Sequence, residues 1–168
     1  FKDWFEDYDM TLSNYQGELA TADLLEFMDF AHNHEEQGYI EWPEGEKLKM
    51  TVANPQTWSV SLKKNAGWFD LEGELTIDDE TVISIAQLLD MMGNSHSRFI
   101  RLDDDKYLTI SEQLRKQLQK IDAVASRQHG KVVIPAVGMA VLGEALNGEL
   151  EITHPKALDE LRAKIRKS

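Results

Sequence analysis

The sequence predicts an α+β fold, in which helices pack on an antiparallel β meander that is partly built from two tandem ββα units. Three observations lead to this class. Apolar and polar residues alternate from about residue 48 to 77, which is the period of strands with one buried face. On either side of that stretch, apolar residues recur with the spacing of amphipathic helices. A strand, acidic turn, strand and helix follow one another twice between residues 75 and 125.

Length and composition suit a domain that folds without staples. The 168 residues fit one domain or two small ones, and the chain has no cysteine, which excludes disulfides, thiolate metal sites and a cysteine nucleophile. No apolar run approaches the ~20 residues of a membrane span, and no signal-peptide pattern opens the chain. We therefore expect a cytoplasmic protein without membrane contact. The start at Phe1 indicates a segment of a longer protein.

The charge is negative and uneven. The net charge is −12, with −10 in residues 1–50, −4 in residues 51–100 and +2 in residues 101–168. The first third repels phosphates, so we expect weak or no binding of free duplex DNA by this chain. Two interpretations of the acidity stay open, a solubilising surface and a face that docks on a basic partner.

The N-terminal segment is expected to be helical and irregular. Residues 1–20 mix aromatic side chains with acids and show no clear period. Thr21 is a suitable N-cap for a predicted helix over residues 22–35, which Gly38 ends. The apolar face of this helix is expected to comprise Leu24, Phe27, Met28 and Ala31.

The strands of the meander follow, separated by turn sequences at Asn54-Pro55 and Asn65-Ala66-Gly67. We expect three strand segments to pair as neighbours with one buried face. Their alternating apolar residues are Leu48, Met50 and Val52; Trp58, Val60 and Leu62; and Phe69, Leu71, Leu75 and Ile77.

The two ββα units indicate an internal duplication. In the first, the acidic turn 78–80 joins two strands, and Ser84 with Gln87 forms a capping box that opens a short helix. In the second, the turn 103–105 joins two strands and Ser111 caps a longer helix. The apolar face of the longer helix is expected to comprise Leu114, Leu118, Ile121 and Ala125.

Short strands and helices are predicted for the end of the chain. Residues 131–134 form a strand, Pro135 starts a helix through Leu146, and residues 149–153 form another strand. Pro155 suits the first turn of a last helix, whose basic end complements the helix dipole. The apolar face of this helix is expected to comprise Leu158, Leu161 and Ile165.

The metal-like motifs are weak. His32 and Glu36 have the four-residue spacing of ligands on a helix, but His34 lies on a different face and no third ligand is near. A solvated helix end is the favoured interpretation. A calcium loop beginning at Asp103 would need a glycine and a glutamate at its sixth and twelfth positions, where this chain has Leu108 and Leu114. The sequence therefore predicts no metal site.

No catalytic motif stands out. Gly130-Lys131 lacks the earlier glycine and the following serine or threonine of a phosphate loop, and no nucleophile elbow occurs. Carboxylates are abundant, but none is marked as desolvated. We expect no catalytic residue and no cofactor in this chain. A carboxylate-based hydrolase is the least favoured alternative.

Lys63 and Lys64 are the candidate nucleic-acid contacts, because they lie near Trp58 and Trp68 in the sequence. Bases beside exposed aromatic rings are typical of single-strand binding. A structural role is the favoured interpretation, since Trp58 continues the apolar alternation and the lysines mark a strand end.

Four elements between residues 58 and 126 occur in the order and spacing of a known family. They are Gly67-Trp68-Phe69-Asp70-Leu71-Glu72-Gly73-Glu74-Leu75, Ile85-Ala86-Gln87-Leu88-Leu89, Ser97-Arg98-Phe99-Ile100-Arg101-Leu102, and Tyr107-Leu108-Thr109-Ile110 before the capped helix. In this order they resemble the SNF2-helicase-associated region of bacterial SNF2-type ATPases.

The resemblance implies three parts. Residues 48–126 would be the SNF2-helicase-associated-like domain, residues 1–47 an N-terminal segment, and residues 127–168 a strand and helix connection toward an ATPase motor. The family's catalytic residues, with ATP and Mg²⁺, belong to the motor, and none has a matching position here. The motif residues with an implied structural role are Trp68, Phe69, Asp70, Leu71, Leu88, Leu89, Phe99, Leu102 and Leu108.

The function implied is that of a non-catalytic accessory or regulatory domain of a bacterial SNF2-family DNA-dependent ATPase. Its partners would be the parent's own motor and, as a second choice, another protein. The alternative is a free-standing acidic protein-interaction module that mimics nucleic acid.

Overall fold

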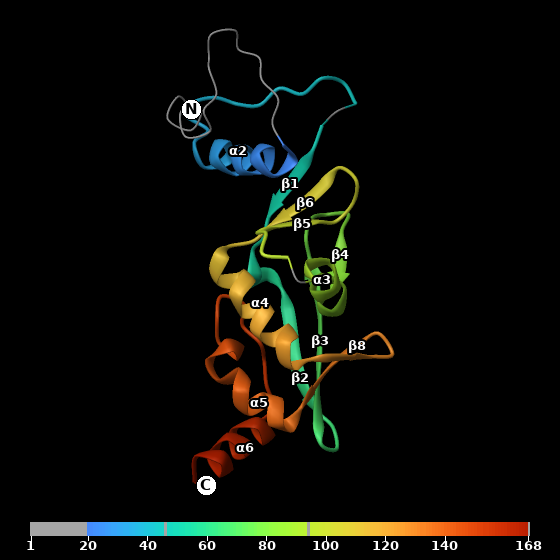
Figure 1. The fold of residues 1–168 in the computed structure, drawn as a ribbon, viewed down its shortest axis with the longest axis vertical. Coiled ribbons are helices and arrows are strands. Elements are labelled where there is room, and N and C mark those ends of the chain that lie inside the picture. The colour runs from blue at the N-terminus through green and yellow to red at the C-terminus, as the bar shows by residue number, and fades with distance from the viewer. Residues whose placement is uncertain (1–19, 46, 94, 168) are drawn as a thin grey trace.

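The computed structural model describes residues 20–45, 47–93 and 95–167, and it confirms the α+β class. Strands form two sheets that are mostly antiparallel. The molecule is elongated, with α2 (Thr21–Asn33) near one end and α6 (Lys156–Lys167) at the other (Figure 1). The features expected for residues 1–19 lie outside the described part.

The larger sheet is built around the long strand β3 (Trp68–Thr76). One edge of β3 pairs with β2 (Ser59–Lys64) in the predicted hairpin. The other edge pairs with β8 (Lys131–Pro135) along its first half and with β4 (Val82–Ser84) along its second. β7 (Ser126–Gln128) completes the sheet beside β8. All of these pairs are antiparallel, as the alternation predicts.

Gly73 lies where β3 and β2 approach most closely. A β-carbon at this position would stand 2.3 Å from the carbonyl oxygen of Ser59 and 2.7 Å from the α-carbon of Val60. Only glycine therefore allows the hairpin to pair without a shift of the backbone.

The smaller sheet has the order β1-β6-β5, with β1 (Lys49–Val52), β6 (Lys106–Thr109) and β5 (Phe99–Arg101). β5 and β6 are antiparallel, but β1 is parallel to β6. The expectation that residues 48–52 form the first strand of the meander is wrong in this respect. The alternation of apolar and polar residues identifies a half-buried strand, but it does not identify the strand's partner. In this structure a 3-10 turn at Pro55–Thr57 separates β1 from β2.

Both ββα units are present, one in each sheet. β3, β4 and α3 (Ile85–Met92) form the first, and β5, β6 and α4 (Glu112–Val124) form the second. The capping box of α3 is confirmed, because Gln87 N donates to Ser84 Oγ at 3.1 Å and Ser84 N donates to Gln87 Oε1 at 2.8 Å. Ser111 caps α4, as predicted, by accepting from Leu114 N at 3.0 Å.

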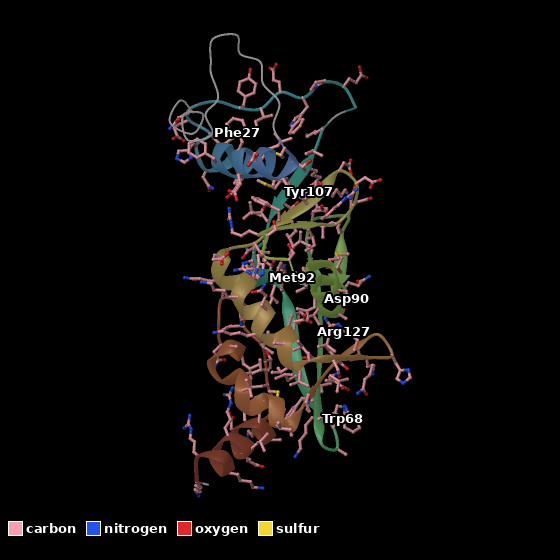
Figure 2. All side chains as sticks on the ribbon, viewed as in Figure 1. Phe27, Trp68, Asp90, Met92, Tyr107 and Arg127 are labelled. Atoms are coloured by element: carbon pink, nitrogen blue, oxygen red, sulfur yellow. The ribbon has the colours of Figure 1, made fainter. Side chains whose placement is uncertain are left out.

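One hydrophobic core joins both sheets to the helices, and it includes Ile100 and Leu108 of the smaller sheet. The apolar face of α4 lies at its centre, with three side chains that have no exposed surface, Leu114, Leu118 and Ile121. Arg127 of β7 crosses toward the helices and donates to Asp90 of α3 at 2.9 Å and to Asp122 of α4 at 2.6 Å (Figure 2). The sheet and both helices are therefore linked by polar as well as apolar contacts.

The C-terminal part belongs to the same core. Since β8 pairs with β3, the predicted boundary after residue 126 divides one sheet. The helix expected through Leu146 is shorter: α5 (Ala136–Leu142) ends where Gly143 takes a φ of +47°, and a 3-10 turn follows. The expected strand over residues 149–153 is reduced to isolated bridges.

The side chain of Gln117 stabilises this irregular loop. Its buried Nε2 donates to the carbonyl oxygens of Ala145 at 2.7 Å and Leu150 at 2.8 Å, and its Oε1 accepts from Leu150 N at 2.9 Å. The side-chain amide thus satisfies backbone groups that a strand partner would otherwise pair. Gly148 packs on it so closely that a β-carbon there would lie 2.5 Å from Gln117 Cδ.

α2 and α6 lie at the two ends. The N-cap of α2 is Ala20, without a side-chain hydrogen bond, so the role predicted for Thr21 is wrong. Of the face predicted for α2, Met28 and Ala31 are buried together with Leu25, while Leu24 and Phe27 are half-buried. In α6, Leu158 is fully buried and Leu161 partly buried, and the side chain of Ile165 lies outside the described part. No helix among the described residues is long and apolar enough to cross a membrane.

Candidate interaction surfaces

The residues of the family motif divide between core and surface. Most are buried: Phe69, Leu71, Leu88, Leu89 and Leu108, while Phe99 and Leu102 are half-buried. Trp68 is the exception, because 41% of it is exposed. The structural role implied for Trp68 is therefore not that of a buried core residue. Successive strand residues face opposite sides, so the inward side chain of Phe69 places Trp68 on the outer face.

Asp70 holds Trp68 and the hairpin turn together. Its Oδ1 accepts from the indole Nε1 of Trp68 at 3.2 Å, and its Oδ2 accepts from Asn65 Nδ2 at 2.5 Å. The indole ring is therefore oriented by a polar contact while it remains accessible (Figure 2).

The two candidate lysines lie on the same hairpin. Lys63 and Lys64 are exposed, whereas Trp58 is buried and offers no exposed ring for a base. Lys63 Nζ lies 2.6 Å from Glu72 Oε2, and this hydrogen bond raises the pKa of Lys63 and lowers the pKa of Glu72. Lys63 pairs with Asp70 and shares the face of Trp68, whereas Lys64 pairs with Phe69 and lies on the other face of the hairpin.

The acidic turns of the two ββα units lie near each other in the half of the molecule that carries α2 (Figure 1). Lys49 of β1 joins them, because its backbone N donates to the carbonyl oxygen of Asp105 at 2.7 Å and its Nζ lies 3.3 Å from Asp78 Oδ2. Lys106 Nζ lies 4.0 Å from Glu80 Oε2 across the same space. We call this region, residues 78–80 and 103–105, the acidic end.

The acidic end carries excess negative charge. Its six carboxylates face three cations, Lys49, Arg101 and Lys106. Glu80 N donates to Asp78 Oδ1 at 2.9 Å, and this backbone hydrogen bond, with the nearby Lys49, lowers the pKa of Asp78 to about 2. The carboxylates beyond Asp78 are exposed to solvent.

The metal-like residues do not converge. His32 Nδ1 lies 3.8 Å from Glu35 rather than near Glu36, and the ring of His34 stacks on Phe30 at 4.1 Å between centroids. Within the described ranges, no group of three or more histidine, cysteine, aspartate or glutamate residues is placed to hold a metal ion.

The perturbed carboxyls stay ionised. The pKa values of Glu72, Asp78 and Glu112 are lowered, that of Glu112 by the hydrogen bond from Arg115. A general acid or base near neutral pH needs the opposite shift. These three carboxyls therefore act in charge pairing.

Two of the hollows on the described surface bear on a hydrolytic function. A cavity of about 500 Å³ lies between α2 and β1, and a cleft of about 620 Å³ lies between β2 and the loop after Gly148. The cavity contains His32 without a serine or threonine, and the cleft contains Ser59 and Thr153 without a histidine. Neither lining combines a hydroxyl with a histidine, and the carboxylates of the cleft are Glu149 and Glu151.

Sequence reasoning missed Val137 and Val141 of α5, which are among the most exposed large apolar residues described. α5 is apolar on all sides, so its composition indicates a fully buried helix. The sequence of α5 has no polar face that could have marked these two valines as exposed.

Comparison with protein-family models, with curated proteins and with solved structures finds no match to this chain. The likeness to the SNF2-helicase-associated region therefore stays a prediction that rests on the four sequence elements.

Proposed function

We propose that this chain is a non-catalytic accessory domain of a cytoplasmic bacterial SNF2-type ATPase, and that it restrains the motor by docking on it. The observation that carries the proposal is the segregation of charge along the molecule. The two acidic turns gather in the half of the molecule that carries α2, and the basic residues of α6 lie at the opposite end. The resemblance supplies the identity of the parent protein.

Electrostatics gives the docking its mechanism. DNA-tracking proteins need basic surfaces to contact phosphates. The acidic end offers carboxylates to such a surface, and a tether raises the local concentration of the module beside the motor. DNA would compete for the same cations, so binding of DNA would release the restraint.

The test compares ATPase rates of the parent with and without residues 1–168, in the absence and presence of DNA. Restraint predicts a higher basal rate after deletion, with a difference that shrinks as salt screens the contact. The paired change Asp79→Asn and Asp105→Asn should raise the basal rate in the same direction. Glu151→Gln with Glu160→Gln is the matched control, because it removes equal charge from exposed positions outside the acidic end. An unchanged basal rate in the deletion contradicts restraint.

The alternative is a free-standing acidic module that mimics nucleic acid. The exposed carboxylates of the acidic end favour this alternative too. The two proposals differ in the coding sequence that they expect after residue 168. A phosphate loop in the next ~100 residues would support the accessory domain, and a stop codon would support the free-standing module.

A further inference from the structure

α5 exposes an apolar stripe that the core does not use. Val137 and Val141 are 76% and 73% exposed, and Ala140 beside them is also exposed. The opposite face packs inward through Gly138 and Met139. Since β-branched residues contribute little to the stability of a short exposed helix, the two valines have no evident role in holding α5 in place.

The stripe continues onto the outer face of the larger sheet. Ala136 N donates to the carbonyl oxygen of Gly67 at 3.3 Å, and Trp68 lies directly opposite the exposed Pro135 in the β3–β8 pairing. Trp68, Pro135 and the stripe therefore follow one another across the join of strand and helix. We call the set Trp68, Pro135, Val137, Ala140 and Val141 the α5 surface.

Unbalanced cations lie beyond the α6 end of the α5 surface. At the Trp68 end, Lys63 is paired with Glu72 at 2.6 Å, and Lys64 lies opposite Phe69 and therefore on the other face of the hairpin. At the other end, the carbonyl oxygen of Gly143 accepts from Arg162 Nη2 of α6 at 2.8 Å. α6 then presents Arg166 and Lys167 near its C-terminus. In a chain with a net charge of −12, the five cations and two acids of α6 are a local reversal of sign at one end of this apolar surface.

We propose that the α5 surface binds an acidic amphipathic helix of a partner protein. The α5 surface carries two valines one helical turn apart and an accessible indole. These side chains match the apolar residues that such a helix presents on one face. The cations of α6 match carboxylates at one end of such a helix, which favours association and orients the helix. This inference does not depend on the proposed function, which concerns the acidic end.

The same surface suits nucleic acid poorly. The indole N–H of Trp68 is already bonded to the carboxylate of Asp70, so the ring has no free donor for a base or a phosphate. Val137 and Val141 offer no hydrogen-bond donor to a phosphate or a base. An apolar protein face with carboxylates at the end that meets α6 is the complementary ligand.

To test this proposal, the full 168-residue chain is titrated by calorimetry with a synthetic helical peptide. The peptide carries leucine along one face and glutamate elsewhere. We expect binding that Val137→Ser with Val141→Ser weakens by about tenfold or more, because two buried side chains are lost from the contact. Val82→Ser is the matched control, since Val82 is an exposed valine in β4 outside the α5 surface. It should leave the affinity unchanged.

Four outcomes would overturn the proposal. The first is an absence of binding, and the second is equal binding of a peptide with lysine in place of glutamate. The third is tight binding of a single-stranded oligonucleotide that Trp68→Ala abolishes, which would make the surface a nucleic-acid site. The fourth is a dimer in sedimentation that the double valine variant dissociates, which would make a second copy the occupant. None of these results bears on the ATPase comparison, so the two proposals fail separately.

Discussion

The helices α2 and α4 have the same length of thirteen residues, but they are held to the molecule in different ways. α4 lies in the centre of the main core, and its apolar face has no exposed surface. α2 buries three side chains outside that core, and Arg98 bonds it to the body through Glu26 at 3.2 Å and Asp29 at 3.3 Å. The buried side chains of α2 are Leu25, Met28 and Ala31.

The amphipathic period of a helix therefore does not by itself measure how firmly the helix is attached to the domain. A helix that shares the main core opens only when the domain unfolds, while one held by a small apolar cluster and ion pairs opens locally at lower cost. The molecule therefore combines a cohesive part, around β3 and α4, with a part around α2 and β1 that depends on polar contacts.

The largest expected effect tests the cohesive part. Leu118→Ala in α4 should lower the free energy of unfolding by about 2–5 kcal/mol, because it leaves a cavity in a fully buried site. Urea denaturation measures the loss. Met28→Ala in α2 is the control, and it should cost clearly less. Equal losses would mean that α2 shares the main core after all.

The next effect concerns the hydrogen bonds between the side chain of Gln117 and the loop after α5. Gln117→Ala should cost about 1–3 kcal/mol, because it leaves the buried backbone groups of Leu150 without partners. Gln119→Ala is the matched control on the same helix, since Gln119 makes one longer bond of 3.3 Å to Ser95 O. Thermal or urea denaturation of both variants gives the comparison. A similar cost for both would show that the loop after α5 is held by other contacts.

Features with a local cause could be predicted from the sequence. The capping box of Ser84 needs only a residue three positions away, and the β2–β3 hairpin follows from a turn whose glycine, Gly67, adopts a φ of +87°. The buried face of α4 follows from spacing alone. These elements decided the fold class.

Features that depend on distant parts of the chain could not be predicted. The parallel partner of β1 lies more than fifty residues away, and alternation does not specify it. The outward face of Trp68 follows from the inward face of Phe69, but an aromatic pair gives no signal for which member turns in. The exposed valines of α5 could not be found because a helix apolar on all sides has no polar face to mark its orientation.

A smaller effect tests the attachment of α2. Arg98→Ala should change the global free energy of unfolding by about 1 kcal/mol or less, because the ion pairs are partly exposed. It should still speed hydrogen exchange of the amides in α2, since the helix loses its polar link to the body. Arg101→Ala is the control, because its partner Asp104 belongs to a turn and not to α2. Unchanged exchange in α2 would mean that its apolar cluster alone holds it.

The smallest effect concerns Asp78, which links the turn after β3 to β1 through Lys49. Its pKa in the folded protein is about 2, below its ordinary value of 3.8. A lowered carboxyl pKa contributes stability that is fully present above the ordinary value and is lost as the pH falls through about 2. Asp78→Asn keeps an acceptor for Glu80 N but removes the charge that faces Lys49. Urea midpoints should therefore separate wild type from Asp78→Asn at pH 6, and the gap should close between about pH 4 and pH 2. Asp79→Asn, at an exposed neighbouring position, should show no such closing gap. A separation that stays constant across this range would mean that the charge of Asp78 contributes nothing, and that β1 is held by its pairing with β6.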